Sequence, residues 1–125
     1  MPSVVQRFAA PRSKVAAFTY DLSTATGSQA VTGVGFKPRA IIFMGAVSSG
    51  VGAWGMVGND LADGAVSSLV VDTFYPSGDA IIAVTVSGSL QQAVVASYDA
   101  DGFTLTWTKT GAPTGTATLY ALCFE

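Results

Sequence analysis

The chain of 125 residues is long enough to bury one hydrophobic core and too short for two domains of ordinary size. Half of its residues are hydrophobic and 11% are charged, which excludes a chain that is disordered by composition and suits a surface that contacts other proteins. No apolar run approaches the roughly 20 residues that a membrane-spanning helix needs, and the first residues lack the layout of a signal peptide. We therefore expect no membrane association and no secretion.

The charges are unevenly distributed, although their sum is only −2. Five of the six basic residues lie within the first 39 residues, whereas seven of the eight acidic residues follow them. A nucleic-acid-binding surface would need a denser basic patch with interleaved aromatic residues, so we expect no nucleic acid partner. The basic start of the chain fits better with a segment that faces protein.

Residues 1–13 are expected to form an extended N-terminal arm, and residues 14–125 the folded domain. Pro2 and Pro11 interrupt the arm, and neither the period of a strand nor that of a helix is sustained. Ordering about ten residues costs on the order of 10–20 kcal/mol of backbone entropy, so we expect the arm to become ordered against a neighbour; a frayed terminus is the alternative. Its candidate contact residues, on a capsid or on another subunit, are Val5, Arg7, Phe8 and Arg12.

The remainder of the chain predicts a succession of short strands. Aromatic and β-branched residues favour strands, and turn residues recur every eight to fifteen positions or so. The expected strands are residues 14–22, 40–44, 54–57, 66–74, 80–86, 91–98, 103–108 and 116–124. The expected core residues are Ile41, Phe43, Ile82, Val84, Phe103, Leu105, Trp107, Leu119 and Leu122. This pattern predicts an all-β fold, a single-domain β-sandwich that is jelly-roll-like, with a barrel as the alternative.

Local patterns add detail to this outline. Residues 24–29 carry turn chemistry, and residues 59–64 are expected to form a loop with a turn at Asp63-Gly64. The tetrapeptide Asp-Ala-Asp-Gly at residues 99–102 is typical of a tight β-hairpin turn. The strand at residues 40–44 is apolar at consecutive positions, as expected of a strand that is covered on both faces or lies in a sandwich core.

No residue cluster predicts a cofactor or a metal site. The glycines of residues 50–55 match the Gly-x-Gly-x-x-Gly fingerprint, but no helix start follows them, so we interpret the segment as a loop between strands. The sequence has no histidine and one cysteine, which leaves no basis for a zinc site or a histidine-activated nucleophile. Cys123 lies in an apolar strand pattern and is interpreted as a core residue rather than a reactive thiol.

Paired carboxylates are the remaining route to catalysis. Asp60 with Asp63, or Asp99 with Asp101, could act as a glycosidase pair, and the latter two could also be a fragment of a calcium loop. Nearly all the acidic residues lie in expected turns, however, where solvated aspartate is ordinary turn chemistry. We therefore expect a protein without enzymatic activity and without a cofactor, and a glycan hydrolase that uses Asp60 and Asp63 is the competing enzyme hypothesis.

The two tryptophans, Trp54 and Trp107, lie in expected strands, and core packing is predicted for both. The alternative is that Trp54 is exposed beside Asn59 and Asp60. An exposed aromatic ring with polar neighbours forms a platform on which a sugar can stack. The possible glycan contacts in that alternative are Trp54, Asn59 and Asp60.

Several segments resemble parts of small β-sandwich proteins of tailed-bacteriophage virions, namely head decoration (cement) proteins and the distal modules of fibres and spikes. The similarity covers most of residues 30–124 and consists of turn and strand patterns in a similar order. The segments that carry it are residues 33–44, the Trp-Gly-Met-Val-Gly run at 54–58, the Asp-Gly-Phe-Thr-Leu-Thr-Trp run at 101–107, and Tyr-Ala-Leu-Cys-Phe at 120–124.

This resemblance implies a virion structural protein, a homotrimer that is located on the virion after assembly in the bacterial host cytoplasm. Because the chain carries only a short arm and no repetitive shaft, the resemblance favours a capsid decoration protein that binds and stabilises the head surface. Its partners would be itself and the major capsid protein of the phage head. The alternative is a receptor- or glycan-binding tip module of a tail or head fibre, with a host surface glycan as its ligand.

Overall fold

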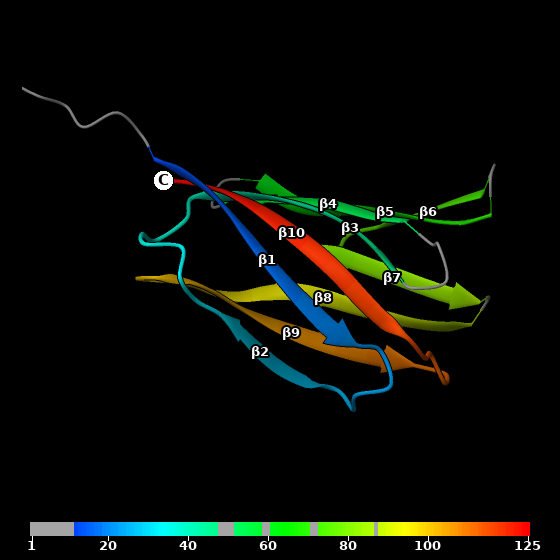
Figure 1. Cartoon of the computed structure of the whole chain (residues 1–125). Coiled ribbons are helices and arrows are strands. Elements are labelled where there is room, and N and C mark those ends of the chain that lie inside the picture. Colours follow the sequence, from blue (N-terminus) through cyan, green and yellow to red (C-terminus); the bar gives the residue numbers. More distant parts are fainter. Residues whose placement is uncertain (1–11, 48–51, 59–60, 71–72, 87) are drawn as a thin grey trace, which may run out of the picture.

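The computed structural model describes residues 12–47, 52–58, 61–70, 73–86 and 88–125, and these form two antiparallel β-sheets packed face to face (Figure 1). The strands of this described part are β1 (Ser13–Asp21), β2 (Gly27–Val31), β3 (Ala40–Val47), β4 (Gly52–Gly58), β5 (Leu61–Val70), β6 (Thr73–Ser77), β7 (Ile81–Val86), β8 (Ser89–Asp99), β9 (Gly102–Thr110) and β10 (Thr116–Phe124). The larger sheet has the order β1-β10-β3-β4-β5-β6 and the smaller one β2-β9-β8-β7. The prediction of an all-β, single-domain β-sandwich is confirmed.

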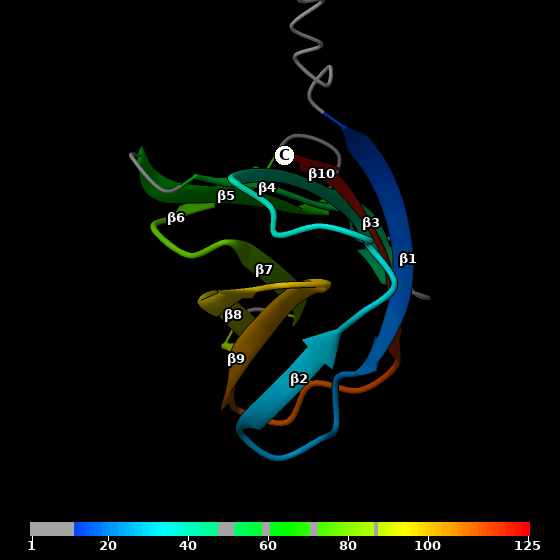
Figure 2. The ribbon, with the colours of Figure 1, turned by 90° about the vertical axis from the view of Figure 1, so that its left-hand side faces the viewer.

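Strands that follow one another in sequence are neighbours in most of both sheets. β3 to β6 form one meander and β7 to β9 another. β1 and β2 are consecutive in the chain but belong to different sheets, so the turn between them joins the two layers at one side of the sandwich (Figure 2). β10 lies between β1 and β3 and thereby pairs with both.

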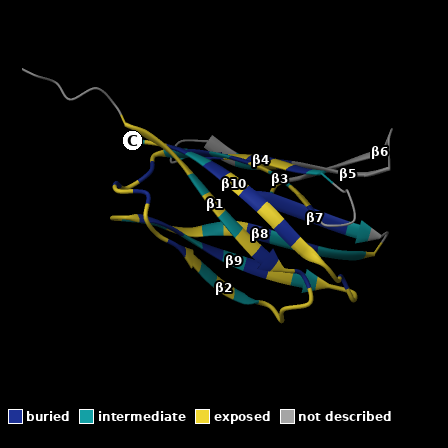
Figure 3. Cartoon of the chain, in the orientation of Figure 1, coloured by how far each residue is buried: buried dark blue, intermediate teal, exposed yellow. Residues whose placement is uncertain are grey.

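The hydrophobic core lies between the two sheets because each strand turns every second side chain inward. Buried and exposed residues alternate along β10, as Figure 3 shows, and the same period holds in β9. The expected core residues are buried with one exception, Leu122, which is taken up below. Among the largest fully buried side chains are Trp107, Phe43, Phe103, Leu22, Ile41, Ile81, Leu105 and Leu119.

Aromatic rings connect the sheets at two points. Phe43 of β3 contacts Phe103 of β9 edge to face, with ring centroids 5.5 Å apart, and Phe18 of β1 packs edge-on against both rings. Tyr20 of β1 stacks on Trp107 of β9 with the centroids 4.1 Å apart. Such aromatic pairs contribute about 0.5–1.5 kcal/mol each beyond the area they bury. These ring contacts join β1 and β3 of the larger sheet to β9 of the smaller sheet.

Two glutamines, Gln29 at the margin of the core and Gln91 within it, satisfy polar groups of the chain. The Nε1 atom of Trp107 donates to Oε1 of Gln29 at 3.0 Å, and Nε2 of Gln29 donates to the carbonyl oxygen of Thr19 at 2.9 Å. Gln91 of β8 is fully buried, and its Nε2 atom donates to the carbonyl oxygens of Leu22 and Thr24. The turn between β1 and β2 is therefore tied to the core by a side chain of β8 in the smaller sheet.

Some predicted boundaries are wrong because pairing across the sheet overrides local turn chemistry. The segment 24–29, predicted as a turn, enters β2, whose residues Gly27–Val31 pair with β9. The predicted turn at Asp63-Gly64 lies inside β5, where Gly64 pairs with Met56 of β4. The predicted strand at 66–74 is divided between β5 and β6.

Leu122 is the one predicted core residue that the structure places elsewhere. The alternation of β10 buries Ala121 and Cys123, so Leu122 points to the other face of the sheet and is only half-buried. A strand that is apolar at successive positions does not reveal by itself which set of residues faces the core.

Candidate functional site

The most distinctive surface of the described residues is the side of the larger sheet that is turned away from the core. We call it the outer face and define it by the outward positions of four neighbouring strands. These are Ser13, Val15, Ala17 and Thr19 of β1; Thr118, Tyr120, Leu122 and Phe124 of β10; Ala40, Ile42, Met44 and Ala46 of β3; and Gly52, Trp54, Met56 and Gly58 of β4. None of these residues carries a charge; the remaining outward position of β1 is Asp21, which lies opposite Thr116 at the end of the outer face.

Large apolar side chains on the outer face are open to solvent. The exposed fractions are 56% for Val15, 54% for Met44, 39% for Trp54, 60% for Met56, 51% for Tyr120 and 36% for Phe124. On the smaller sheet, by contrast, Val94 is the one large hydrophobic side chain of the described residues that is exposed to a comparable degree. The two outer surfaces of the sandwich therefore differ in chemistry.

The strand register arranges the outer face in rows that run across the sheet. Tyr120 lies opposite Met44, and Met44 lies opposite Trp54. The next row consists of Val15, Leu122, Ile42 and Met56. Side chains directly opposite one another on neighbouring strands are within contact distance, so the rows merge into one continuous apolar surface.

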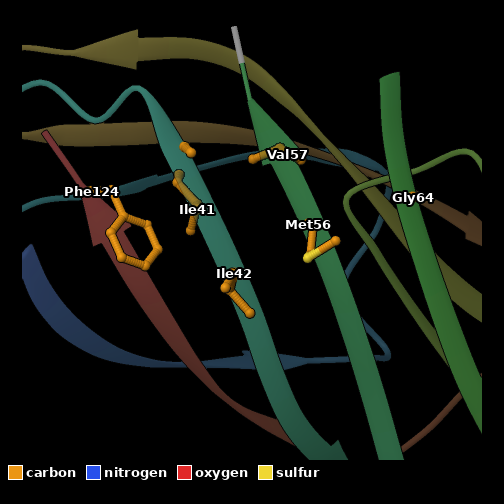
Figure 4. A pocket seen from close by; sticks show the side chains of 7 residues that line it. Ile41, Ile42, Met56, Val57, Gly64 and Phe124 are labelled. Carbon is orange, nitrogen blue, oxygen red and sulfur yellow. The ribbon is translucent and has the colours of Figure 1, made fainter. Parts of the chain in front are cut away.

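A hollow of about 280 Å³ opens on the outer face beside the second of these rows (Figure 4). In Figure 4 the side chains of Phe124, Ile42 and Met56 stand around it on three adjacent strands, and Gly64 of β5 leaves its far side without a side chain. The lining residues are Ala40, Ile41, Ile42, Met56, Val57, Gly64 and Phe124. An apolar cavity of about 150 Å³ already holds a benzene ring, so this hollow has room for an aromatic side chain.

Trp54 belongs to this surface, and the prediction that it packs in the core is wrong. It points outward from β4 and exposes 39% of its surface, whereas Trp107 is fully buried as predicted. The exposed Trp54 meets one condition of the glycan-binding alternative. Asn59 and Asp60, the polar residues of that alternative, lie outside the described residues.

Of the four candidate arm contacts, the structure describes only Arg12; Val5, Arg7 and Phe8 lie outside the described residues. The Arg12 guanidinium forms an ion pair with Glu125, donates to the carbonyl oxygen of Gly35 at 3.3 Å, and lies 5.2 Å from the centroid of the Phe36 ring. Its hydrogen bond also lowers the pKa of the Glu125 carboxyl group below its usual range. Arg12 therefore fixes the start of β1 to the body of the protein.

Asp99 and Asp101 act as turn residues, as predicted. Asp101 accepts hydrogen bonds from the backbone amides of Gly33 and Gly35, and these lower the pKa of its carboxyl group. Asp99 accepts from the hydroxyl groups of Thr104 and Ser97, each at 2.7 Å, and its pKa is lowered for the same reason. Both carboxylates are engaged by the chain itself.

Asp63 is the one described aspartate whose pKa is raised. Burial is the main cause, and the charge of Asp79 adds to it. A carboxyl group with a raised pKa has the property that a general acid needs. Asp79, however, accepts a hydrogen bond from Nε2 of Gln92 at 2.6 Å, and Asp60, the predicted partner of Asp63, lies outside the described residues.

The remaining candidates for chemistry are Cys123 and clusters of metal ligands. Cys123 is fully buried, as predicted for a core residue, and burial raises the pKa of its thiol to about 11. Within the described ranges, no three His, Cys, Asp or Glu side chains gather in a group able to hold a metal ion. The same part of the chain contains no helix that is long and apolar enough to cross a membrane.

Comparison with protein-family models gives no match, and comparisons with curated proteins and with solved structures give no significant match. The resemblance to phage virion proteins therefore remains a prediction from the turn and strand patterns of the sequence.

The outer face was not predicted from the sequence, although its signal is present there. The run of apolar residues at 40–44 predicted a strand that is covered on both faces or lies in a sandwich core. In the structure, Ile41 and Phe43 are covered by the opposite sheet, whereas Met44 is exposed. The sequence pattern thus indicates a sheet that is apolar on both sides. In the described residues, the smaller sheet covers one of these sides and the other is open to solvent.

Proposed function

We propose that this protein is a non-catalytic assembly protein of a bacteriophage virion, in its simplest form a decoration protein that binds the head surface and stabilises it. In this proposal the β-sandwich is the rigid body and the outer face is a surface for contact with protein. The resemblance of its turn and strand segments to those of phage structural proteins supports the placement on a virion.

The outer face is the observation that carries the proposal. With side-chain areas on the order of 150–250 Å² for the large residues, its exposed apolar side chains amount to about 600 Å². The largest such patch on a typical soluble monomer is about 300–600 Å² and is often functional. A patch at the upper end of this range, whose exposed side chains are all uncharged, supports a role in stable contact with other protein.

The arm is the second element of the proposal. Val5 and Phe8 supply apolar area and Arg7 a charge, and these suit contact with an acidic capsid or subunit surface. Arg12 is held by Glu125 at the edge of the larger sheet, and the next residue, Ser13, lies opposite Phe124 of the outer face. Arm and outer face would then act on the same side of the protein.

The test is to measure, by co-sedimentation, the binding of the protein to purified capsids of the phage that carries the gene. We expect the full chain to bind, and a variant that lacks residues 2–11 but keeps Arg12 to fold and fail to bind. Immunogold labelling of virions should place the protein on the head. Absence of capsid binding by the full chain, or label on the tail alone, would contradict the decoration role.

A glycan-binding tip module is the second candidate, favoured by the exposure of Trp54 and Tyr120 at opposite ends of one row. Sugar-binding platforms combine aromatic rings with polar groups. The residue between Tyr120 and Trp54, however, is the apolar Met44. Binding of host surface polysaccharide that is lost in Trp54→Ala would favour this module over decoration. Release of reducing sugar that Asp60→Asn abolishes would favour a hydrolase instead.

A further inference from the structure

We infer that the outer face binds the outer face of a second copy of this chain, so that two sandwiches pack face to face about a two-fold axis, in place of the homotrimer that the resemblance implies. The inference rests on the proposed role of the outer face as a contact surface and names its partner. Four observations support a second copy as that partner.

The first observation is area. About 600 Å² of exposed apolar side chain on each copy gives about 1,200 Å² in a pair, which reaches the lower limit of specific, stable protein interfaces. The half-buried residues Leu122 and Ile42, which lie between the exposed ones, would add to this area. The surface therefore reaches the size that a specific pair needs.

The second observation is charge. The chain carries a net charge of −2, and two copies that met through charged surfaces would need complementary patches on one and the same face. The rows of Tyr120 and Leu122 carry no charge, and the one charged outward residue of these four strands, Asp21, lies at the end of β1, so these rows can face those of a second copy without repulsion and without stranding a buried charge. Uncharged rows are self-complementary in this respect.

The third observation is shape. In a two-fold interface every contact occurs twice, so a surface that pairs with itself needs both a protrusion and a recess. The row that carries Tyr120 and Trp54 supplies exposed rings, that of Trp54 lying over Gly52, and the hollow beside Met56 lies along the neighbouring row. If the two sheets are offset by about one row, the rings of each copy face the hollow of the other.

The fourth observation is the sequence of the strands. β3 is apolar on both of its faces, and such strands occur where both faces of a sheet are covered. The smaller sheet covers the inner side, as the burial of Ile41 and Phe43 shows. A second sheet packed at about 10 Å on the outer side would complete this arrangement.

The experiment is size-exclusion chromatography with light scattering on the full chain over a wide range of concentration. We expect the wild type to have twice the monomer mass. Met44→Glu and Met56→Glu each place a charge in the proposed interface, and we expect them to weaken self-association on the order of a hundredfold. Val94→Glu, at an exposed apolar position of the smaller sheet, is the matched control and should leave the mass unchanged.

A second measurement needs no variant. In a single copy Trp54 is partly exposed and Trp107 is fully buried, so acrylamide should quench one of the two tryptophans. We expect the quenchable fraction to disappear as the concentration is raised through the dimerisation range. A wild type that is monomeric throughout, a trimer, or an oligomer that withstands both methionine substitutions would overturn the inference.

Capsid binding by the same variants separates this inference from the proposed function. If the wild type forms the pair through the outer face but binds no capsid, the decoration role fails and the inference stands. If the wild type is monomeric and Met44→Glu abolishes capsid binding, the outer face contacts the capsid, the inference is overturned and the proposed function stands.

Discussion

The carboxylate of Asp101 accepts a hydrogen bond of 2.7 Å from the backbone amide of Gly35, a residue 66 positions earlier in the chain. The second carboxylate oxygen accepts a hydrogen bond from the backbone amide of Gly33 at 3.0 Å. The backbone carbonyl oxygen of Asp101 accepts one from the amide of Val34. Gly33 and Gly35 have positive φ angles of 87° and 86°, which glycine adopts without strain and which aim both amides at one acceptor. The tip of the β8–β9 hairpin and the loop between β2 and β3 are thus joined.

We expect Asp101→Asn to destabilise the fold, because an amide oxygen replaces only one of the two acceptors and the new NH₂ group faces a donor. The pKa of Asp101 is lower in the folded state than in the unfolded chain, so its contribution is complete above about pH 4 and is lost as the pH falls through the folded value. Chemical denaturation at several pH values should show the difference between variant and wild type shrinking below about pH 4.

Asp63→Asn is the control with the opposite sign. Burial and the charge of Asp79 raise the pKa of Asp63 in the folded state, so its ionisation disfavours folding. The variant should be more stable than the wild type at neutral pH, and this gain should vanish at acidic pH. An Asp101→Asn effect that does not change with pH would contradict the role given to its two backbone hydrogen bonds.

Gly55→Ala should destabilise the protein by about 1–3 kcal/mol or more, as overpacking of a core does. A Cβ atom at Gly55 would overlap the carbonyl oxygen of Ala80, where the chain enters β7 against β4. Gly78→Ala is the control, because no heavy atom lies within 4 Å of its Cβ position. Urea denaturation of both variants checks the prediction, and equal stabilities would contradict the close approach of these two strands.

The glycine at position 55 also shows how a sequence motif can have a structural cause. The Gly-x-Gly-x-x-Gly match at residues 50–55 ends at Gly55 of β4, which is a strand and not a helix start. Because β4 begins at Gly52, the interpretation of the segment as a loop between strands is wrong for residues 52–55. The absence of a side chain at Gly55 lets the second sheet approach. A dinucleotide site could be rejected from the sequence alone, but the structural reason for a glycine at position 55 could not be predicted from it.

The inward positions of β9 were predictable because polar threonines alternate with Phe103, Leu105 and Trp107, and this alternation assigns each residue to a face. The hairpin at residues 99–102 was predictable from its Asp-Gly chemistry. β2 was not, since its strand character depends on pairing with the distant Phe103–Trp107 segment. Trp54 was assigned to the wrong side because β4 is glycine-rich and apolar on both faces.

The two tryptophans provide a direct comparison of burial. Trp107→Ala should cost about 3–5 kcal/mol, because it removes a fully buried ring that stacks on Tyr20 and leaves Gln29 without its donor. Trp54→Ala should cost about 1–2 kcal/mol, since much of that ring is already in solvent. Thermal and urea unfolding measure both. A larger loss for Trp54→Ala would contradict the orientation of β4.

Gln91→Met should destabilise the protein by about 1–3 kcal/mol, although methionine has a similar length and is more hydrophobic. The Nε2 atom of Gln91 donates to the carbonyl oxygens of Leu22 and Thr24 at 3.0 Å and 2.8 Å, so its loss deprives both of a donor. Among the described residues, its Oε1 atom is buried and has no hydrogen-bond partner, so the known contacts of the side chain are those of the amide donor. Gln91→Glu should cost more than Gln91→Met, because a carboxylate would face those carbonyl oxygens with no proton to donate. Urea unfolding of the two variants tests this order, and a methionine variant as stable as the wild type would show that the turn between β1 and β2 does not depend on Gln91.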